Sequence, residues 1–415
     1  TTVALLNANP DFALPDTTRF RDYKYKVGFK PDYISQPEVG YGTGNEYGLS
    51  GFNGGTTIVL SDLLGNDQIA LSASVYGQLS DASVFGEYAN LSHRWQWSAG
   101  AYQQPIYLPQ SGLSVTDNND GSEHISAQLS RYVLRNAFLT TQYPLNKFTR
   151  FETGLQFNSI GRSLVELSQD CLFDGECSPL QLNSLESAPA YNFFQPSVAF
   201  VSDNSLFGLT GPITGRRMRF SIAPAVGNLR WVDYLADYRR YDPIIFNTIT
   251  IATRFLGSAS VGRDELSFPK YIGLPEYVRG YDSENFSGFQ CTSVLSSGSN
   301  CGQEALVGSR VAVFNAEIRF PIIRRFDLGG LPIGLPPVEG LFFYDEGLAY
   351  SKGQTVSLTK PANYDLNLQR YPLRSYGFGL RVNLFNLAIL KWDFAKPLDA
   401  PGRKANWTFS LGPSF

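Results

Sequence analysis

The feature that most limits the fold of this chain is a repeated alternation of apolar and other residues with a period of two. Between Val311 and Ile322 every even position is apolar, whereas the odd positions turn polar from Asn315 onward. The same alternation runs through Tyr376–Leu384 and Ala388–Ala395. Successive side chains of a β-strand point to opposite faces, so this pattern predicts strands with one apolar face. We therefore expect an all-β fold.

Two classes of all-β protein show such alternation, the soluble β protein and the transmembrane β-barrel. Mean hydropathy is -0.15, and no stretch approaches the about 18 uninterrupted apolar residues of a membrane-spanning helix, which excludes a helical membrane protein. The less apolar face carries long charged side chains and many glycines, as a water-filled interior does. Aromatic residues also gather at strand ends, for example Trp95 with Trp97, as in the interface girdles of barrels. We predict a transmembrane antiparallel up-and-down β-barrel, with a soluble β protein as the alternative.

Counting the alternating segments predicts about sixteen strands. An even number places both ends of the chain on one side, which is the periplasm in bacterial barrels. The connections on that side are mostly short, such as 64–67 and 93–94, whereas 108–129, 165–189, 261–308 and 351–373 are long and are predicted to lie outside the cell. The predicted strands are 23–35, 52–63, 68–78, 82–92, 95–107, 130–143, 150–164, 190–203, 215–231, 235–245, 248–260, 309–322, 338–350, 374–384, 387–396 and 406–415.

The charge balance and the scarcity of histidine exclude several functions. The chain has 34 Lys and Arg against 37 Asp and Glu, a net charge of -3, so it lacks the basic face of a nucleic-acid binder. His93 and His124 lie in different connections, and no Gly-x-Ser-x-Gly sequence is present, so no catalytic residues are predicted. We expect neither an enzyme nor a resident cofactor or metal. Lysines and arginines such as Arg217 and Arg219 make part of the interior cationic, which we interpret as balancing interior carboxylates, with anion passage as the alternative.

The four cysteines all fall in connections that the strand count places outside the cell, where disulfides are stable. The simplest pairing joins Cys171 to Cys177 and Cys291 to Cys301. Four cysteines allow three connectivities, so a bridge between the two loops remains open. Metal binding is not expected, because neither a Cys-x-x-Cys spacing nor a nearby histidine is present.

The long connection 261–308 carries the sequence Val278-Arg279-Gly280-Tyr281. This motif, in the loop before the twelfth predicted strand, resembles the signature of the BamA/TamA surface-antigen superfamily of outer-membrane proteins. The segments 315–321 and 342–347 resemble the twelfth and thirteenth strands of that family. The likeness is specific over roughly 270–415 and is one of pattern over 20–270. In detail the chain is most similar to barrels that follow a periplasmic propeller-like domain in larger proteins.

The resemblance implies that loop 261–308 folds back into the barrel lumen and that Arg279 contacts the inner wall. The alternation agrees, because Glu317, Phe343 and Asp345 fall on the polar faces of their strands. A guanidinium reaching two carboxylates makes bidentate bonds that lysine cannot copy. We predict Arg279–Asp345 as the main pair and Glu317 as the second partner. Gly280 is expected to let the backbone turn beside the wall.

The last predicted strand resembles the C-terminal β-signal that the family's assembly machinery reads. Its outward residues are Trp407, Phe409 and Leu411, and it ends at Phe415. This short strand must pair with the first strand to close the barrel. Pro413 cannot donate a ladder hydrogen bond, so the seam between these strands is predicted to be weak.

The resemblance implies a function in outer-membrane protein assembly or polypeptide translocation through that seam. One alternative is a membrane anchor or exporter for an upstream domain, and a second is a passive porin. We expect residues 1–20 to be a periplasmic linker and 21–415 the barrel, in the outer membrane of a diderm bacterium with both termini periplasmic. The expected partners are outer-membrane lipid and lipopolysaccharide, the assembly machinery and a periplasmic partner or upstream domain, but no nucleic acid.

Overall fold

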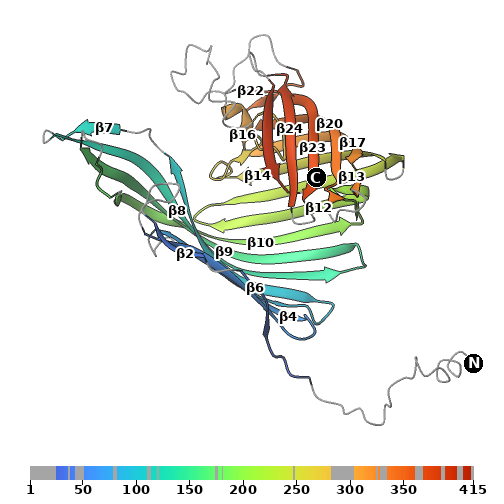
Figure 1. Ribbon diagram of the computed structural model, residues 1–415, viewed down its shortest axis with the longest axis horizontal. Coiled ribbons are helices and arrows are strands. Elements are labelled where there is room, and N and C mark those ends of the chain that lie inside the picture. Colours follow the sequence, from blue (N-terminus) through green and yellow to red (C-terminus); the bar gives the residue numbers. More distant parts are fainter. Residues whose placement is uncertain are drawn as a thin grey trace, which may run out of the picture.

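The computed structural model describes residues 25–35, 38–42, 51–77, 82–109, 114–118, 121–172, 176–179, 181–245, 248–281, 303–323, 326–327, 334–359, 368–384, 388–399 and 405–412. Almost all of them belong to one antiparallel sheet (Figure 1). The described residues include one short 3₁₀ helix, η4 (Gln303–Leu306). No helix within these ranges is both long and apolar enough to cross a membrane.

The sheet is a meander in which each long strand pairs with the next along the chain. It has sixteen ladder positions in the described residues, because β1 and β2 share one edge of β3. The predicted strand number and fold class are therefore confirmed. The strands in ladder order are β1 (Lys30–Ile34) with β2 (Glu38–Gly42), β3 (Gly51–Ser61), β4 (Asp67–Gly77), β5 (Ser83–Asn90), β6 (Gln96–Pro109), β8 (Ser122–Pro144), β9 (Thr149–Leu172), β10 (Gln181–Asp203), β12 (Pro212–Gly227), β13 (Trp231–Ile245), β14 (Ile249–Gly262), β17 (Arg310–Ile323), β20 (Val338–Tyr350), β23 (Leu373–Leu384), β24 (Ala388–Pro397) and β25 (Asn406–Leu411).

Short strands complete the connections between the ladder positions. Two of them extend ladder edges, β7 (Ser114–Asp117) along β8 and β11 (Leu206–Phe207) along β12. Within loops, β15 (Lys270–Tyr271) pairs with β16 (Val307–Gly308), β18 (Phe326–Asp327) with β19 (Gly334–Leu335), and β21 (Thr355–Val356) with β22 (Gln369–Arg370).

The two ends of the meander lie apart in Figure 1, with β4 and β6 at the lower edge and β23 and β24 at the upper edge. Among the residues that the structure describes, no ladder joins β1 or β2 to β25. The predicted closing pair of first and last strands is therefore not formed there, and the seam stays a prediction.

The two faces of the sheet have opposite chemistry, and the apolar face is the exposed one. Phe342, for example, is 58% exposed, whereas Arg319 on the other face is 1% exposed. Cross-strand register places the members of each set on a common face. A soluble sandwich has the reverse arrangement, with its apolar faces buried. The exposed apolar face of this sheet is therefore suited to contact with lipid. Its exposed residues include Leu71, Val84, Leu155, Phe157, Phe194, Val198, Phe220, Ile222, Phe255, Ile318, Tyr376, Trp407 and Phe409, and the buried charged residues opposite include Arg254, Glu317, Asp345, Arg381 and Asp393.

Strands β8, β9 and β10 are far longer than the sequence predicts. They have 23, 24 and 23 residues, whereas about 9–11 residues cross a bilayer. The predicted loops 108–129 and 165–189 are therefore largely strand, and Figure 1 shows these ends with β7 projecting away from the rest of the sheet. These added residues of β8, β9 and β10 form a strand extension, and the ladder hydrogen bonds run through all of it. The alternation continues in β8 and β9, where Ile125, Ala127, Leu129, Val165 and Leu167 are separated by polar residues, but it is absent from residues 181–189 of β10. The prediction was wrong because it ended these strands early, although pairing between neighbouring strands extends them beyond the most apolar segments.

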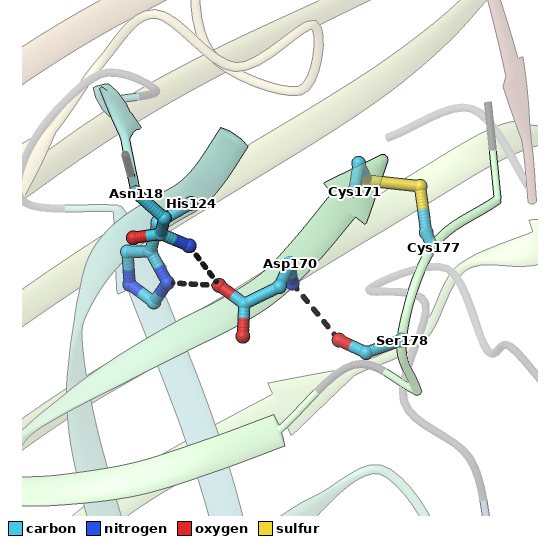
Figure 2. The surroundings of a disulfide bond; sticks show 6 residues. All are labelled: Asn118, His124, Asp170, Cys171, Cys177 and Ser178. Carbon is cyan, nitrogen blue, oxygen red and sulfur yellow. Dashed lines mark hydrogen bonds and ion pairs between the residues drawn. A yellow bond between two sulfur atoms is a disulfide. The ribbon is translucent and has the colours of Figure 1, made fainter. Parts of the chain in front are cut away.

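The tip of the strand extension contains the predicted Cys171–Cys177 disulfide. Beside it, Asp170 accepts hydrogen bonds from His124 Nδ1 at 2.7 Å and Asn118 Nδ2 at 3.2 Å, as Figure 2 shows. The backbone N–H of Asp170 also donates to Ser178 Oγ at 2.9 Å. These contacts hold Cys177 and Ser178 against the end of β9.

Two further strand boundaries differ from the prediction. Residues 25–29 alternate in sequence but form no strand, so the first strand is only Lys30–Ile34. The turn after β12 is 228–230, so Trp231 begins β13 instead of ending the strand before it. The predicted linker 1–20, Phe415 and the pair Cys291 and Cys301 lie outside the described residues.

Candidate functional site

The candidate site is an inner wall formed by β17 and β20. The odd residues of β17, Asn315, Glu317 and Arg319, point to the inner face by the strand period. Register places Asp345 of β20 beside Asn315, and Phe343 beside Glu317. The wall is therefore a compact patch of charge and one aromatic ring on two adjacent strands.

The loop after β14 returns along this wall. The outgoing and returning segments of the loop are joined by the β15–β16 pair, and Ile272 N donates to Leu306 O at 2.9 Å. A tight turn follows, in which Val278 N donates to Leu274 O at 3.1 Å. This turn presents the next residue, Arg279, to the wall.

Arg279 makes a bidentate contact with Asp345. Its Nε and Nη2 donate to the two carboxylate oxygens of Asp345, each at 2.7 Å, and its backbone N–H donates to the same group at 3.2 Å. Its third nitrogen, Nη1, donates to Glu317 Oε1 at 2.7 Å. The guanidinium also lies over the Phe343 ring, 3.6 Å from the centroid. One side chain thus contacts the three predicted wall residues.

The wall carboxylates have further partners, so none of this buried charge is left uncompensated. Asp345, which is 0% exposed, also accepts from Asn315 Nδ2 at 2.8 Å. Glu317 accepts from Arg319 Nε at 2.8 Å. One strand farther, Arg381 Nη2 donates to Asp393 at 2.8 Å, and Arg279 Nη1 lies 3.6 Å from the same carboxylate. Three guanidiniums and three carboxylates therefore form one bonded network.

Arg279 remains charged in this position. Burial acts to lower the pKa of Arg279, but the charges of Asp345 and Glu317 outweigh it and hold the pKa above its ordinary value. The loop is consequently attached to the wall by a permanent cation.

The neighbours of Arg279 fit the wall closely. Gly280 has a φ of 85°, in the left-handed region that favours glycine, and a Cβ there would lie 3.2 Å from Ala395 Cβ. The Tyr281 hydroxyl donates to Arg374 O at 2.8 Å and accepts from Asp399 N at 3.2 Å. Burial raises the pKa of Tyr281 above its ordinary value, so the hydroxyl stays protonated.

Val278 enters an apolar cluster that the sequence did not predict. The cluster fills the inside of the sheet beneath the loop, where a polar lumen was expected. A signal was present, because Val311 and Val313 occupy inward positions of β17 that a water-filled channel would not favour. The cluster consists of Leu256, Ile272, Val278, Tyr281, Leu306, Val311, Val313, Ala349, Tyr371 and Leu373.

Glu265 forms a second attachment at the base of the loop. It is buried, and it accepts from Ser309 Oγ at 3.0 Å and from Arg310 Nη2 at 3.2 Å. The backbone N–H of Lys352 in the neighbouring connection donates to it at 3.3 Å. Burial acts to raise the pKa of Glu265, but these donors outweigh it and hold the pKa below 4.5, its ordinary value.

We expect acid to loosen the loop base through Glu265. Because its pKa is lowered by folding, its contribution to stability is present above pH 4.5 and is lost as the pH falls through the folded-state pKa. Amide hydrogen exchange of Ser309 and Lys352, corrected for intrinsic rates, should therefore accelerate below pH 4.5. Glu265→Gln should show weak protection at every pH. An identical pH profile in this variant would assign the acid effect to another group.

The remaining predicted residues lie away from this wall. Trp407, Phe409 and Leu411 of β25 are exposed on the apolar face, and Trp407 packs on Phe394 with ring centroids 5.1 Å apart. Cys171 and Cys177 lie at the tip of the strand extension. The structure thus brings together the loop and wall residues but not the β-signal or the cysteines.

Comparison with solved structures gives the fold of known outer-membrane proteins. A BamA from Haemophilus ducreyi lacking POTRA domains 1–3 matches with a TM-score of 0.56 and 14% identity, over 94% of this chain and 71% of that chain. CdiB from Acinetobacter baumannii matches with a TM-score of 0.47 and 16% identity, over 88% of this chain and 56% of that one. CdiB from Escherichia coli matches at 0.49 and 10%, over 87% and 58%. This chain therefore spans little more than half the length of the two CdiB chains.

The sequence matches no curated protein. The model of the Omp85 superfamily domain, however, matches residues 106–415, about three quarters of the chain, and that range contains the loop and the whole wall. The chain therefore belongs to the Omp85 superfamily, a family of outer-membrane β-barrels that act in protein assembly or translocation.

Proposed function

We propose that this barrel passes client polypeptides into or across the outer membrane through a seam between its first and last strands. The observation that carries the proposal is the pair of strand edges that lack a partner in the described residues, that of β1 with β2 and that of β25. Unpaired edges offer a row of backbone donors and acceptors to an incoming extended segment. A client strand would pair there by β-augmentation.

The lengths of the edge strands support an opening seam. β25 has 6 described residues, and β1 and β2, which share the first ladder position, have 5 each, whereas β17 in the wall has 14. Few ladder bonds therefore have to break when these edges separate. The outward residues Trp407 and Phe409 of β25 give its edge a lipid-facing apolar side, which suits contact with a client strand of the same pattern.

The loop contact with the wall supports the same proposal. Arg279 holds the loop on the inside of β17, β20 and β24, and β24 is the ladder neighbour of the last strand, β25. We propose that this contact keeps the wall beside the seam in place when β25 separates from the first strand. In this arrangement both termini face the periplasm, since an even strand number places them together.

The seam is tested by locking it. Cysteine pairs, one in β1 and one in β25, are introduced and oxidised in the full chain in native membranes. Client insertion or export in these cells should fall sharply on oxidation and return on reduction. A pair placed in β4 and β5, which are already laddered, serves as the control and should have no effect. Full activity of an oxidised β1–β25 pair would rule out the seam.

A further inference from the structure

We propose that the inner wall of β9–β14, at the end of the short turns, binds a multiply charged oxyanion of the phosphate class. The residues that define this arginine wall are Arg150, Arg217, Arg219, Arg239 and Arg254, with the carboxylates Glu152, Asp203 and Asp237. This proposal does not depend on the seam, and it is tested without any client.

The sheet register places like charges directly beside one another in this wall. Arg217 of β12 is the ladder partner of Arg239 of β13, and Arg239 is in turn the partner of Arg254 of β14. Like charges at directly opposed positions destabilise a sheet. Three arginines in one lateral row, from three adjacent strands, are therefore costly unless negative charge is supplied.

The carboxylates of the wall supply only part of that charge. Glu152 is shared by Arg150 at 2.7 Å and Arg219 at 2.6 Å. Asp237 is shared by Arg239 at 2.6 Å and Arg254 at 3.0 Å, and Asp203 binds Arg217 at 2.9 Å. Five guanidiniums thus face three carboxylates, an excess of two positive charges. The bonded network around Arg279, with three of each, has no such excess.

The excess charge lies around an open space. A cavity of about 220 Å³ is lined by four of the five arginines, Arg150, Arg217, Arg219 and Arg239, and by Asp203 and Asp237, whereas Arg254 and Glu152 do not line it. The side chains of Arg150, Arg217 and Arg219 are 39%, 39% and 44% exposed, so their guanidinium edges are accessible from the lumen. The cavity has room for an oxyanion together with several waters.

The chemistry of the donors selects the class of ligand. Arginine presents a rigid planar fork that matches the oxygens of phosphate, and bidentate contacts add specificity to charge. Two unbalanced guanidinium charges call for a dianion more than for chloride. The ligand is therefore a phosphate group, either of a free anion or of a lipid headgroup.

The experiment measures binding of inorganic pyrophosphate to the full chain in nanodiscs of phosphatidylcholine, by titration calorimetry at constant ionic strength. Wild-type protein should bind pyrophosphate in excess of an ionic-strength-matched chloride control. Arg217→Gln should weaken binding about tenfold or more, because it removes one charge-assisted contact. Arg240→Gln makes the same charge change next to Arg239 but on the opposite face, where Arg240 is paired with Asp242, and should bind as wild type.

Two further measurements keep the result interpretable. Equal thermal unfolding midpoints of the variants without anion would show that Arg217→Gln leaves the fold intact. Nanodiscs with phosphatidylglycerol then distinguish the source: competition with pyrophosphate assigns the site to a lipid headgroup, and unchanged binding assigns it to a free oxyanion. No binding beyond the chloride control, or equal binding by the Arg217 and Arg240 variants, would overturn the proposal.

Discussion

Arg279→Ala should release the inserted loop from the wall and leave Asp345 and Glu317 as buried, poorly compensated carboxylates. Removing one partner of a buried ion pair costs about 3–5 kcal/mol, because the charge left behind remains desolvated. The loss should be local, since the loop and not the ladder is held by these bonds. Hydrogen exchange at the Val278 amide should accelerate about a hundredfold or more, because its protection requires the docked loop. Protease cleavage within residues 263–281 should increase in parallel.

Two variants show whether the guanidinium geometry carries this effect. Arg279→Lys keeps the charge but cannot bond both oxygens of Asp345 and Glu317 at once, so it should give an intermediate loss. Arg240→Ala removes an exposed pair with Asp242 from the other face and should cost less than about 1 kcal/mol. Unchanged exchange at Val278 in Arg279→Ala would mean that the apolar contacts alone hold the loop.

Gly347→Val should displace the same loop without removing any charge. A Cβ on Gly347 would overlap Val278 Cγ2 and would approach Ile272 Cδ1 to 3.2 Å. Both neighbours are fully buried in the cluster beneath the loop, and valine at position 278 has few rotamers with which to escape. Overpacking of this kind typically costs about 1–3 kcal/mol. We expect faster hydrogen exchange at Val278 and Arg279 and increased cleavage of the loop.

The matched control is Gly257→Val in β14, where nothing lies within 4 Å of the added Cβ. Valine suits a strand, so neither variant should damage its own ladder. Loop exchange should therefore remain as in wild type for Gly257→Val. If Gly347→Val and Gly257→Val behave alike, close packing against β20 is not what keeps the loop in place.

The family match confirms the resemblance recognised in Val278–Tyr281. The alternation within single strands assigned most of the inner-wall residues to the correct face. Odd positions of β17 and β20 point inward whatever their partners are, so Glu317, Phe343 and Asp345 could be assigned to one face from their parity. Asn315 was on the same face, but its bonds to Asp345 and to Tyr277 O depend on register and on the loop turn. No local pattern reports such contacts between residues distant in sequence.

The sequence by itself determined which face of each strand meets lipid, because a period of two and the cost of exposing charge to lipid allow one orientation only. It did not fix where β8, β9 and β10 end, because residues 181–189 of β10 have no apolar alternation and are held extended by their hydrogen bonds to β9. The tertiary structure alone decided that Arg217, Arg239 and Arg254 lie in one row and that the loop fills the inside with apolar side chains. Strand register and the path of the loop bring together residues that are tens of positions apart in the sequence. The free energy of each contact depends on these distant neighbours, which a local sequence pattern does not show.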